Sequence, residues 1–258
     1  MDIKGLAVVN GVYIVGDNQQ TSFENIYIAT RSKENRVYPD EIVAKLPHIA
    51  PEHPHYKEWH LRKGSVEKLL AYLKNKKRVL HILEVGCGNG WVAAQLAQLP
   101  DSTVTAIDVN MTELQQAARV FKDINNLKFI YADIRTDLRA CEYDIIIFAA
   151  SVQYFSSLTE VLDKALQHTA KDGEVHIIDS VFYEFAHIPD AKKRSVEHYS
   201  SLGIPEMYHF YFHHNIEQLN RFTHKVLFDP GSFMNKFTKK NPFHWICVKG
   251  TNAVINSF

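Results

Sequence analysis

Three glycines and a glutamate stand where an apolar run gives way to a helical pattern. Residues 81–91 read HILEVGCGNGW, so Glu84 is followed by Gly86, Gly88 and Gly90. Glycine allows a tight backbone bend without a Cβ atom, and a ligand can then contact main-chain N–H groups at the start of the next helix. The pattern predicts a turn that receives a nucleotide.

Two phosphate-binding motifs do not fit this turn. The dinucleotide motif G-x-G-x-x-G needs glycine at position 91, where this chain has Trp91, and the loop G-x-x-x-x-G-K-[ST] is absent. Two aspartates follow instead, Asp108 after the apolar run TAI and Asp133 after YA. A carboxylate at a strand end can accept hydrogen bonds from both hydroxyls of a ribose. We therefore expect recognition of the sugar through Asp108 rather than of a phosphate.

These residues resemble the motifs of class I S-adenosylmethionine (SAM)-dependent methyltransferases. The first motif of that family has the form E-x-G-x-G-x-G, which residues 84–90 match, and the resemblance extends over about residues 79–179. It implies that SAM is the cofactor and that the chain is an enzyme, a transferase that methylates a small-molecule acceptor.

The resemblance also implies a role for each cofactor residue. The glycine loop lies beside the methionine portion of SAM, and Glu84 orients its amino group. Asp133 accepts from the adenine amine while Ile134 packs on the ring, and the segment around Ala149 lies near the sulfonium. The predicted cofactor contacts are Glu84, Gly86, Cys87, Gly88, Asn89, Gly90, Asp108, Val109, Asp133, Ile134 and Ala149.

The acceptor side is predicted from aromatic residues and histidines that follow the fourth and fifth strands. Tyr154 can present the face of its ring to a cationic sulfur, and residues 182–214 are rich in aromatic side chains. No catalytic residue is evident, because methyl transfer from a sulfonium depends mostly on positioning and needs a base only for acceptors that must lose a proton. Predicted substrate contacts are Tyr154, Tyr183, His209 and Tyr211, and further acceptor-side candidates are Glu184, His187 and His213.

Alternating strands and helices must position these residues. Apolar runs predict strands at residues 79–85, 103–107, 128–131, 144–150 and 174–179, with helical patterns between them. Such alternation predicts a doubly wound α/β fold, and the family resemblance implies a seven-stranded, mostly parallel, Rossmann-like sheet. Two late strands, 224–228 and 243–249, are expected to complete it as a hairpin.

The remaining segments give the domain organisation. We expect an N-terminal extension over residues 1–64, with a hairpin turn at Asn10-Gly11, and a methyltransferase domain over 65–258. A lid or substrate insert occupies 182–222 and, with the extension, is expected to select the substrate. Helices are expected to begin with Ser65, Thr112 and Ser157 as N-terminal caps.

Two other functions remain open at this point. One is a NAD-type oxidoreductase, and the other is a SAM-binding module without turnover. The 14 histidines show no zinc-binding spacing, so no metal is expected.

The amino-acid composition limits the binding partners and the cellular location that we expect. The chain has 258 residues, 29 Lys plus Arg against 29 Asp plus Glu, and 46% hydrophobic residues, which excludes disorder and gives no overall attraction to nucleic acid. The longest uncharged stretch in its apolar middle, residues 145–159, is shorter than the roughly 20 residues that span a bilayer. Three dispersed cysteines favour a reducing compartment. We therefore expect a cytoplasmic protein with a small-molecule partner, whose oligomeric state the sequence leaves open.

Overall fold

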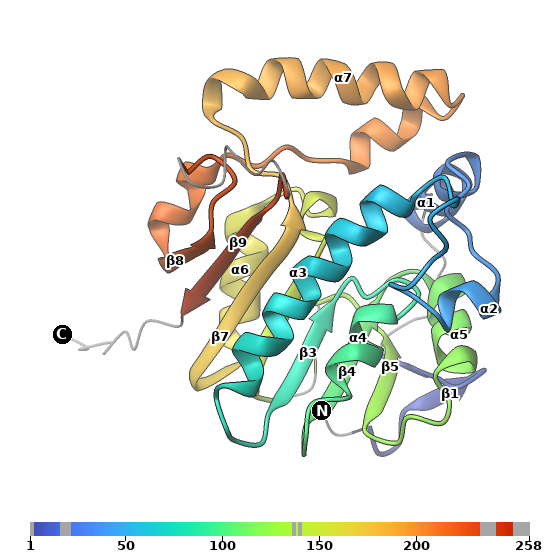
Figure 1. Cartoon of the computed structure of the whole chain (residues 1–258), viewed down its shortest axis with the longest axis vertical. Coiled ribbons are helices and arrows are strands. Elements are labelled where there is room, and N and C mark those ends of the chain that lie inside the picture. The colour runs from blue at the N-terminus through green and yellow to red at the C-terminus, as the bar shows by residue number, and fades with distance from the viewer. Residues whose placement is uncertain (1–2, 16–21, 136–137, 139–140, 233–240, 250–258) are drawn as a thin grey trace.

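The computed structural model describes residues 3–15, 22–135, 138, 141–232 and 241–249, and its centre is one twisted sheet (Figure 1). The strands are β1 Ala7–Val9, β2 Val12–Ile14, β3 His81–Val85, β4 Thr103–Asp108, β5 Leu127–Tyr131, β6 Tyr143–Ala149, β7 Thr169–Ser180, β8 Thr223–Phe228 and β9 His244–Lys249. They form a nine-stranded sheet in the order β1-β2-β5-β4-β3-β6-β7-β9-β8. The strands from β2 to β7 in this order are parallel to their neighbours, whereas β1, β9 and β8 pair antiparallel.

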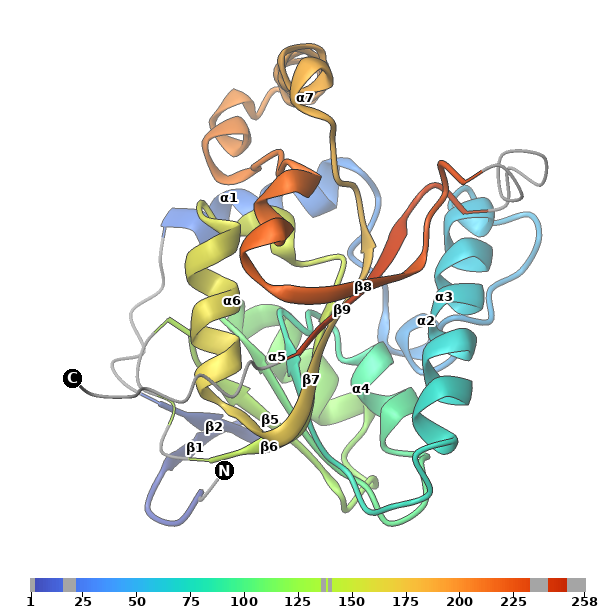
Figure 2. The same ribbon diagram turned by 90° about the vertical axis from the view of Figure 1, so that its left-hand side faces the viewer.

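Helices cover both faces of the sheet (Figure 2). The α-helices are α1 Ser22–Lys33, α2 Asp40–Val43, α3 Tyr56–Lys74, α4 Trp91–Leu96, α5 Met111–Val120, α6 Leu158–Gln167 and α7 Ile188–Ser201. The short 3₁₀ helices are η1 Val152–Tyr154, η2 Phe185–His187, η3 Pro205–Phe210 and η4 Ile216–Arg221. Among these described helices, none is long and apolar enough to cross a membrane.

Alternation along the strands creates two separate apolar cores. Ile82 faces the core shared with α3, α4 and α5, whereas its neighbour Leu83 faces the core shared with α6. The same division separates Ile145 and Ile147 from Ile146. Because successive side chains of a strand point to opposite faces, the continuous apolar runs fill both layers. The predicted doubly wound α/β class is confirmed.

The predicted number of strands was too low, because the N-terminal hairpin joins the sheet. Asn10 and Gly11 adopt φ values of 49° and 84°, as expected for the tight turn between β1 and β2. β2 then pairs in parallel with β5, with Tyr13 opposite Ile130, so seven strands become nine. The late hairpin of β8 and β9 forms as predicted.

Two of the predicted helix starts were wrong. The helix expected from Ser65 already begins at Tyr56, and the Ser65 hydroxyl donates to the Leu61 carbonyl at 3.3 Å inside α3. The predicted division at residue 64 therefore falls within a helix. At α5 the cap is Asn110, whose side chain accepts from the Glu113 N–H at 3.0 Å, and not Thr112. The Ser157 cap of α6 is confirmed.

The N-terminal region is attached to the sheet by a helix that the sequence did not reveal. Glu24, in the first turn of α1, is buried and accepts from the Met111 N–H at 2.8 Å. A carboxylate at this position satisfies a free donor of α5 and opposes the positive end of its dipole. α1 is thereby fixed beside the carboxyl ends of the strands, below α7 (Figure 1).

A buried polar cluster at β7 and β9 contains the one group of possible metal ligands in the described residues, Glu174, His176 and Cys247. Its hydrogen bonds are already made. Trp245 donates to His176 Nδ1 at 3.1 Å, so the protonated Nε2 donates to Glu174 at 3.2 Å, and Lys76 lies 2.7 Å from the same carboxylate. These partners lower the pKa of Glu174 despite its burial. We interpret the cluster as a structural network between α3 and the sheet.

Candidate functional site

The carboxyl ends of the parallel strands form one edge, at which polar residues gather. β3 and β6 are neighbours in the sheet although their connections run in opposite directions, and open α/β sheets bind ligands at such a point. The glycine loop follows β3, Asp108 ends β4, Asp133 follows β5, Ala150 follows β6 and Asp179 lies near the end of β7.

The glycine loop approaches its neighbours too closely for larger residues. Gly86 has φ of +72°, and a Cβ atom there would lie 2.6 Å from the Cβ of Ser151. Ser151 in turn donates to the Val85 carbonyl at 2.7 Å. The loop is therefore held against the end of β6, and the N–H groups of Gly86, Cys87 and Gly90 donate to backbone carbonyls of the protein itself.

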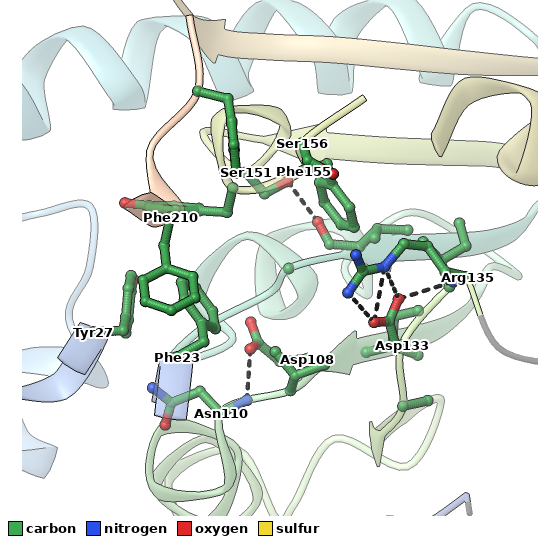
Figure 3. Close-up of a pocket in the computed structure, with 18 of the residues that line it drawn as sticks. Phe23, Tyr27, Asp108, Asn110, Asp133, Arg135, Ser151, Phe155, Ser156 and Phe210 are labelled. Carbon is green, nitrogen blue, oxygen red and sulfur yellow. Dashed lines mark hydrogen bonds and ion pairs between the residues drawn. The ribbon is translucent and has the colours of Figure 1, made fainter. Parts of the chain in front are cut away.

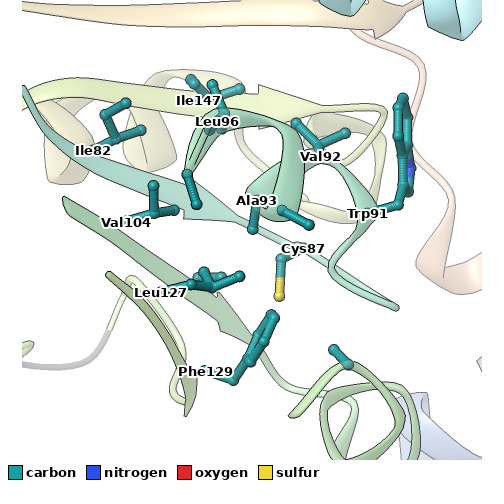
Figure 4. Packing of buried hydrophobic residues seen from close by; sticks show 14 of the residues in the cluster. Ile82, Cys87, Trp91, Val92, Ala93, Leu96, Val104, Leu127, Phe129 and Ile147 are labelled. Atoms are coloured by element: carbon teal, nitrogen blue, oxygen red, sulfur yellow. The ribbon is translucent and has the colours of Figure 1, made fainter. Parts of the chain in front are cut away.

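Gly90 shapes the loop without lining a cavity. Its φ is +75°, and a Cβ atom would lie 2.6 Å from the Phe129 ring and 2.8 Å from the Ala117 Cβ. The side chain of Cys87 also points into this core (Figure 4), where burial raises the pKa of its thiol. Trp91, which replaces the glycine of a dinucleotide motif, is buried against Trp59 with ring centroids 5.2 Å apart.

Asp108 connects the loop to the next helix. Its Oδ2 accepts from the Gly88 N–H at 2.7 Å and its Oδ1 from the Asn110 N–H at 2.8 Å. Burial nevertheless raises the pKa of Asp108 to about 6, because these backbone donors only partly replace lost water. The carboxylate lines a cavity, and each oxygen retains capacity for a further hydrogen bond.

A first cavity of about 440 Å³ runs from Asp108 along the ends of β5 and β6 (Figure 3). Three of the predicted cofactor contacts, Val109, Asp133 and Ile134, line it. The Asp133 carboxylate is not free, because Arg135 contacts it with Nη2 at 2.5 Å and Nε at 3.0 Å. A ligand that uses this carboxylate must share it with a guanidinium.

A second, smaller cavity of about 80 Å³ lies over the glycine loop. Six of the predicted cofactor contacts line it: Glu84, Gly86, Cys87, Gly88, Asn89 and Ala149. Glu84 is buried with one oxygen unpartnered in the described structure, and burial raises its pKa strongly. Glu113 has the same character, with burial raising its pKa to about 7.

Two arginines near these acidic residues offset their negative charge. Arg31 of α1 and Arg62 of α3 both line the second cavity. The Nε of Arg31 is buried and has no hydrogen-bond partner among the described residues. The cavity thus combines carboxylates and a guanidinium with unused hydrogen-bonding capacity, as an amino-acid ligand requires.

A third cavity of about 380 Å³ lies farther out, between α1, α3 and α7. Tyrosines from five segments line it: Tyr27, Tyr154, Tyr183, Tyr199 and Tyr211. Tyr27, Ala150 and Tyr154 line all three cavities, so the three spaces share a wall. We treat these adjacent cavities as one candidate site.

The roof of the site is an aromatic cluster built from distant parts of the chain. The Tyr154 ring contacts Phe23 at 5.9 Å, Tyr27 at 5.4 Å and Tyr211 at 5.9 Å between centroids, and Phe210 lies 5.4 Å from Phe23. Edge-to-face aromatic pairs of this kind contribute about 0.5–1.5 kcal/mol each. α1 and the insert after β7 are therefore packed together through Tyr154.

The acceptor-side predictions divide into two groups. Tyr154, Tyr183 and Tyr211 line the third cavity, whereas His209 lines the first. The structure does not bring Glu184 and His187 to the candidate site, since their side chains are 78% and 66% exposed and line none of the described cavities. His213 lies beside the site, where Ser195 and its Nε2 are 2.9 Å apart, but it lines none of these cavities.

Sequence reasoning missed Tyr27, Arg31, Glu113 and Asp179. Signals for some of them were present. Phe23, Tyr27 and Arg31 recur every four residues in a segment without proline, which indicates one face of a helix. Asp179 lies near the end of a strand, as Asp108 does, and the strand ends of one parallel sheet share an edge.

The central part of the chain is similar in sequence to known proteins. Residues 82–173 match the methyltransferase domain family. A malonyl-[acyl-carrier protein] O-methyltransferase of Bacillus cereus is 33% identical over 117 residues, which is 44% of this chain and 43% of that protein. A ubiquinone biosynthesis O-methyltransferase of Rickettsia akari is 28% identical over 112 residues, 42% of this chain and 43% of that protein. The matched region is less than half of each of these relatives.

Solved structures share the fold over more of the chain. The CurJ carbon methyltransferase superposes with a TM-score of 0.58 and 18% identity, over 84% of this chain and 61% of that one. A second structure is the plantazolicin methyltransferase BpumL in complex with SAH, the demethylated form of SAM. It superposes with a TM-score of 0.53 and 20% sequence identity, over 88% of this chain and 96% of that one.

Proposed function

We propose that the protein transfers a methyl group from SAM to a small-molecule acceptor, since residues 82–173 match the methyltransferase domain family and the chain shares its fold with solved methyltransferases. The observation that carries this proposal is the set of three adjacent cavities at the carboxyl edge of the sheet. In this assignment the first holds adenosine, the second the methionine portion and the third the acceptor. The cytoplasm remains the proposed location.

The first cavity suits an adenosine. Asp108 offers two oxygens to the ribose hydroxyls while its backbone donors hold it in place. Ile134 provides an apolar surface for the adenine ring, and Asp133 accepts from the amine alongside Arg135. Phe23 and Phe210 close the outer side.

The second cavity suits a zwitterionic amino acid next to a cation. Glu84 and Glu113 attract the ammonium group and the sulfonium of SAM, and binding a cation repays part of the cost of burying them. The guanidinium of Arg31 lines the same cavity, and we assign it to the carboxylate of SAM. SAM supplies an already activated methyl group, so the residues of this chain mainly bind, orient and exclude water.

Both alternative functions fit this site less well. The dinucleotide NAD carries two phosphates, which the acids Glu84, Asp108 and Glu113 around the glycine loop would repel. A binding module without turnover would not need an acceptor space, whereas the third cavity adjoins the second through Tyr27, Ala150 and Tyr154.

Calorimetry with the full chain tests the proposed function. SAM and SAH are expected to bind with micromolar dissociation constants, about −8 kcal/mol, and NAD is expected to show no measurable heat. Binding of NAD without either SAM or SAH would replace the proposal with the oxidoreductase alternative.

A second measurement tests the role of Arg31. Replacing it with glutamine is expected to weaken SAM binding by about 10- to 100-fold, because a charge-assisted hydrogen bond contributes about 1.5–3 kcal/mol. Decarboxylated SAM lacks the carboxylate, so its affinity should differ less than about threefold between wild type and variant. Lys33→Gln, an exposed change on the same helix, serves as the control. Equal losses for SAM and decarboxylated SAM would contradict a carboxylate contact.

A further inference from the structure

Asp179 has a buried, unsatisfied oxygen at the junction of two cavities. Asp179 lines both the second and the third cavity, and the residue is only 6% exposed. Its Oδ1 has no hydrogen-bond partner among the described residues. Its φ of +55° lies in the left-handed region, which non-glycine residues rarely adopt. Local backbone strain with an unsatisfied carboxylate is typical of functional sites.

The surroundings keep this carboxylate ionisable near neutral pH. Burial raises its pKa to about 6, while the positive charge of Arg62 and the Ser65 hydroxyl counteract the shift and Glu58 adds to it. Other charged or titratable groups around the two cavities come from α1, α3, α5, α7, η1, β3 and the segments that follow α1, β3, β7 and η3. The charged groups are Arg31, Glu34, Arg36, Glu58, Arg62, Glu84, Glu113 and Arg194, and the other titratable groups are Tyr27, Cys87, Tyr154, Tyr183, His198, Tyr199 and Tyr211.

Building on the proposed function, we infer that Asp179 accepts the proton of the methyl acceptor. The proton of an acceptor O–H passes to the Asp179 carboxylate while an electron pair on the oxygen attacks the methyl carbon; an amine attacks with its lone pair and gives its N–H proton to the same carboxylate. The carbon–sulfur bond breaks at the same time, and its electrons remain on sulfur, which becomes the neutral thioether of SAH. The charge of the sulfonium and that of the carboxylate are both neutralised.

This role defines the class of acceptor. A carboxylate acceptor is already ionised at neutral pH and needs no base. A phenol must lose its proton and an amine loses one once its nitrogen carries the methyl group, so both can use the base, and the tyrosine rings around the third cavity offer an aromatic acceptor surfaces for packing. We therefore assign neutral aromatic hydroxyl or amino compounds as substrates.

The first test measures transfer of labelled methyl groups from SAM to three sets of probes: phenols, anilines and benzoates. Methylation is expected on phenols or anilines and not on benzoates. Methylation of benzoates alone, or of none of the probes by a protein that binds SAM, would overturn the assignment. Failure to bind SAM at all would instead contradict the proposed function.

The second test compares Asp179→Asn with wild type on a responding probe. General-base catalysis predicts a decrease in kcat of at least about 100-fold, with the dissociation constant of SAM changed less than about threefold. Asp190→Asn, an exposed aspartate of α7 that lines none of the described cavities, should keep full activity. A decrease of less than about tenfold for Asp179→Asn on a weakly acidic phenol would overturn the inference.

Two further readouts exclude a merely structural effect. Nitrophenols that are already ionised at the assay pH should be methylated by Asp179→Asn at a rate within about tenfold of wild type, because they need no base. For wild type with a weakly acidic phenol, kcat/KM should fall below about pH 6 as Asp179 becomes protonated. Asp108 also titrates near this pH, so the decrease is assigned to Asp179 only if Asp179→Asn lacks it. An unchanged profile in the variant would argue against Asp179.

Discussion

Replacing Asp108 with asparagine is expected to weaken the binding of SAM by about 100-fold or more. The carboxylate lines the first cavity and accepts from the N–H groups of Gly88 and Asn110 at 2.7 and 2.8 Å. The asparagine amide has only one acceptor atom. Its NH₂ group must therefore face either a backbone N–H group or a ribose hydroxyl, and that donor is left without an acceptor. Loss of one or two charge-assisted hydrogen bonds costs about 3 kcal/mol, which corresponds to the expected change.

Calorimetry at constant ionic strength measures this effect for SAM and SAH. Asp101→Asn is a matched control, because Asp101 is exposed and has φ of +53°, which asparagine tolerates. Circular dichroism separates lost recognition from lost folding. SAM binding within about threefold of wild type by a folded Asp108→Asn protein would refute the assignment of Asp108 to the ribose.

Replacing Gly90 with alanine is expected to destabilise the fold by about 3 kcal/mol. Its positive φ costs an alanine roughly 1–2 kcal/mol, and the new methyl group would lie 2.6 Å from Phe129 and 2.8 Å from Ala117. Overpacking of a filled core adds about 1–3 kcal/mol. The neighbours cannot move freely, because Phe129 belongs to β5 in the centre of the core (Figure 4).

Urea denaturation gives the free energy of unfolding for this comparison. Gly64→Ala is the matched control, since Gly64 lies inside α3 and no atom of another element lies within 4 Å of where the alanine methyl group would stand. Alanine there should stabilise the helix by up to about 1 kcal/mol. A free energy of unfolding for Gly90→Ala equal to that of wild type would contradict this prediction.

The central strands could be predicted because their signal is local. Runs such as residues 144–150 are apolar almost without interruption, and the structure places β6 there, buried on both faces. The turn at Asn10-Gly11 was likewise predicted from two residues. The pairing of this hairpin with β5 was not, because parallel pairing here joins segments far apart in the sequence, such as Tyr13 and Ile130, and leaves no local trace.

Helix α1 was missed for a different reason. Its overall composition is polar, and the inward side carries Phe23, Tyr27 and Arg31, which line the candidate site rather than an ordinary apolar core. Tyr27 of α1, for example, lines the second cavity together with Glu113 of α5, a helix far away in the sequence. Residues that meet only at the site could not be paired from sequence.

The cofactor loop was easier to predict than the acceptor side. Glycines with required backbone angles leave a fixed spacing in the sequence, and Gly86, Gly88 and Gly90 all have positive φ. Aromatic residues and histidines after β7 have no such constraint, so exposed Glu184 and His187 could not be distinguished from Tyr183, which lines the third cavity.

The wall shared by the three cavities has a consequence for the evolution of this protein. A mutation at Tyr27 or Tyr154 that admits a new acceptor also alters the space assigned to SAM, so selection for one property is constrained by the other. Tyr183, Tyr199 and Tyr211 line the third cavity alone and are free of this conflict. Divergence in specificity among descendants of this chain should accumulate at these three positions, while Tyr27 and Tyr154 change slowly.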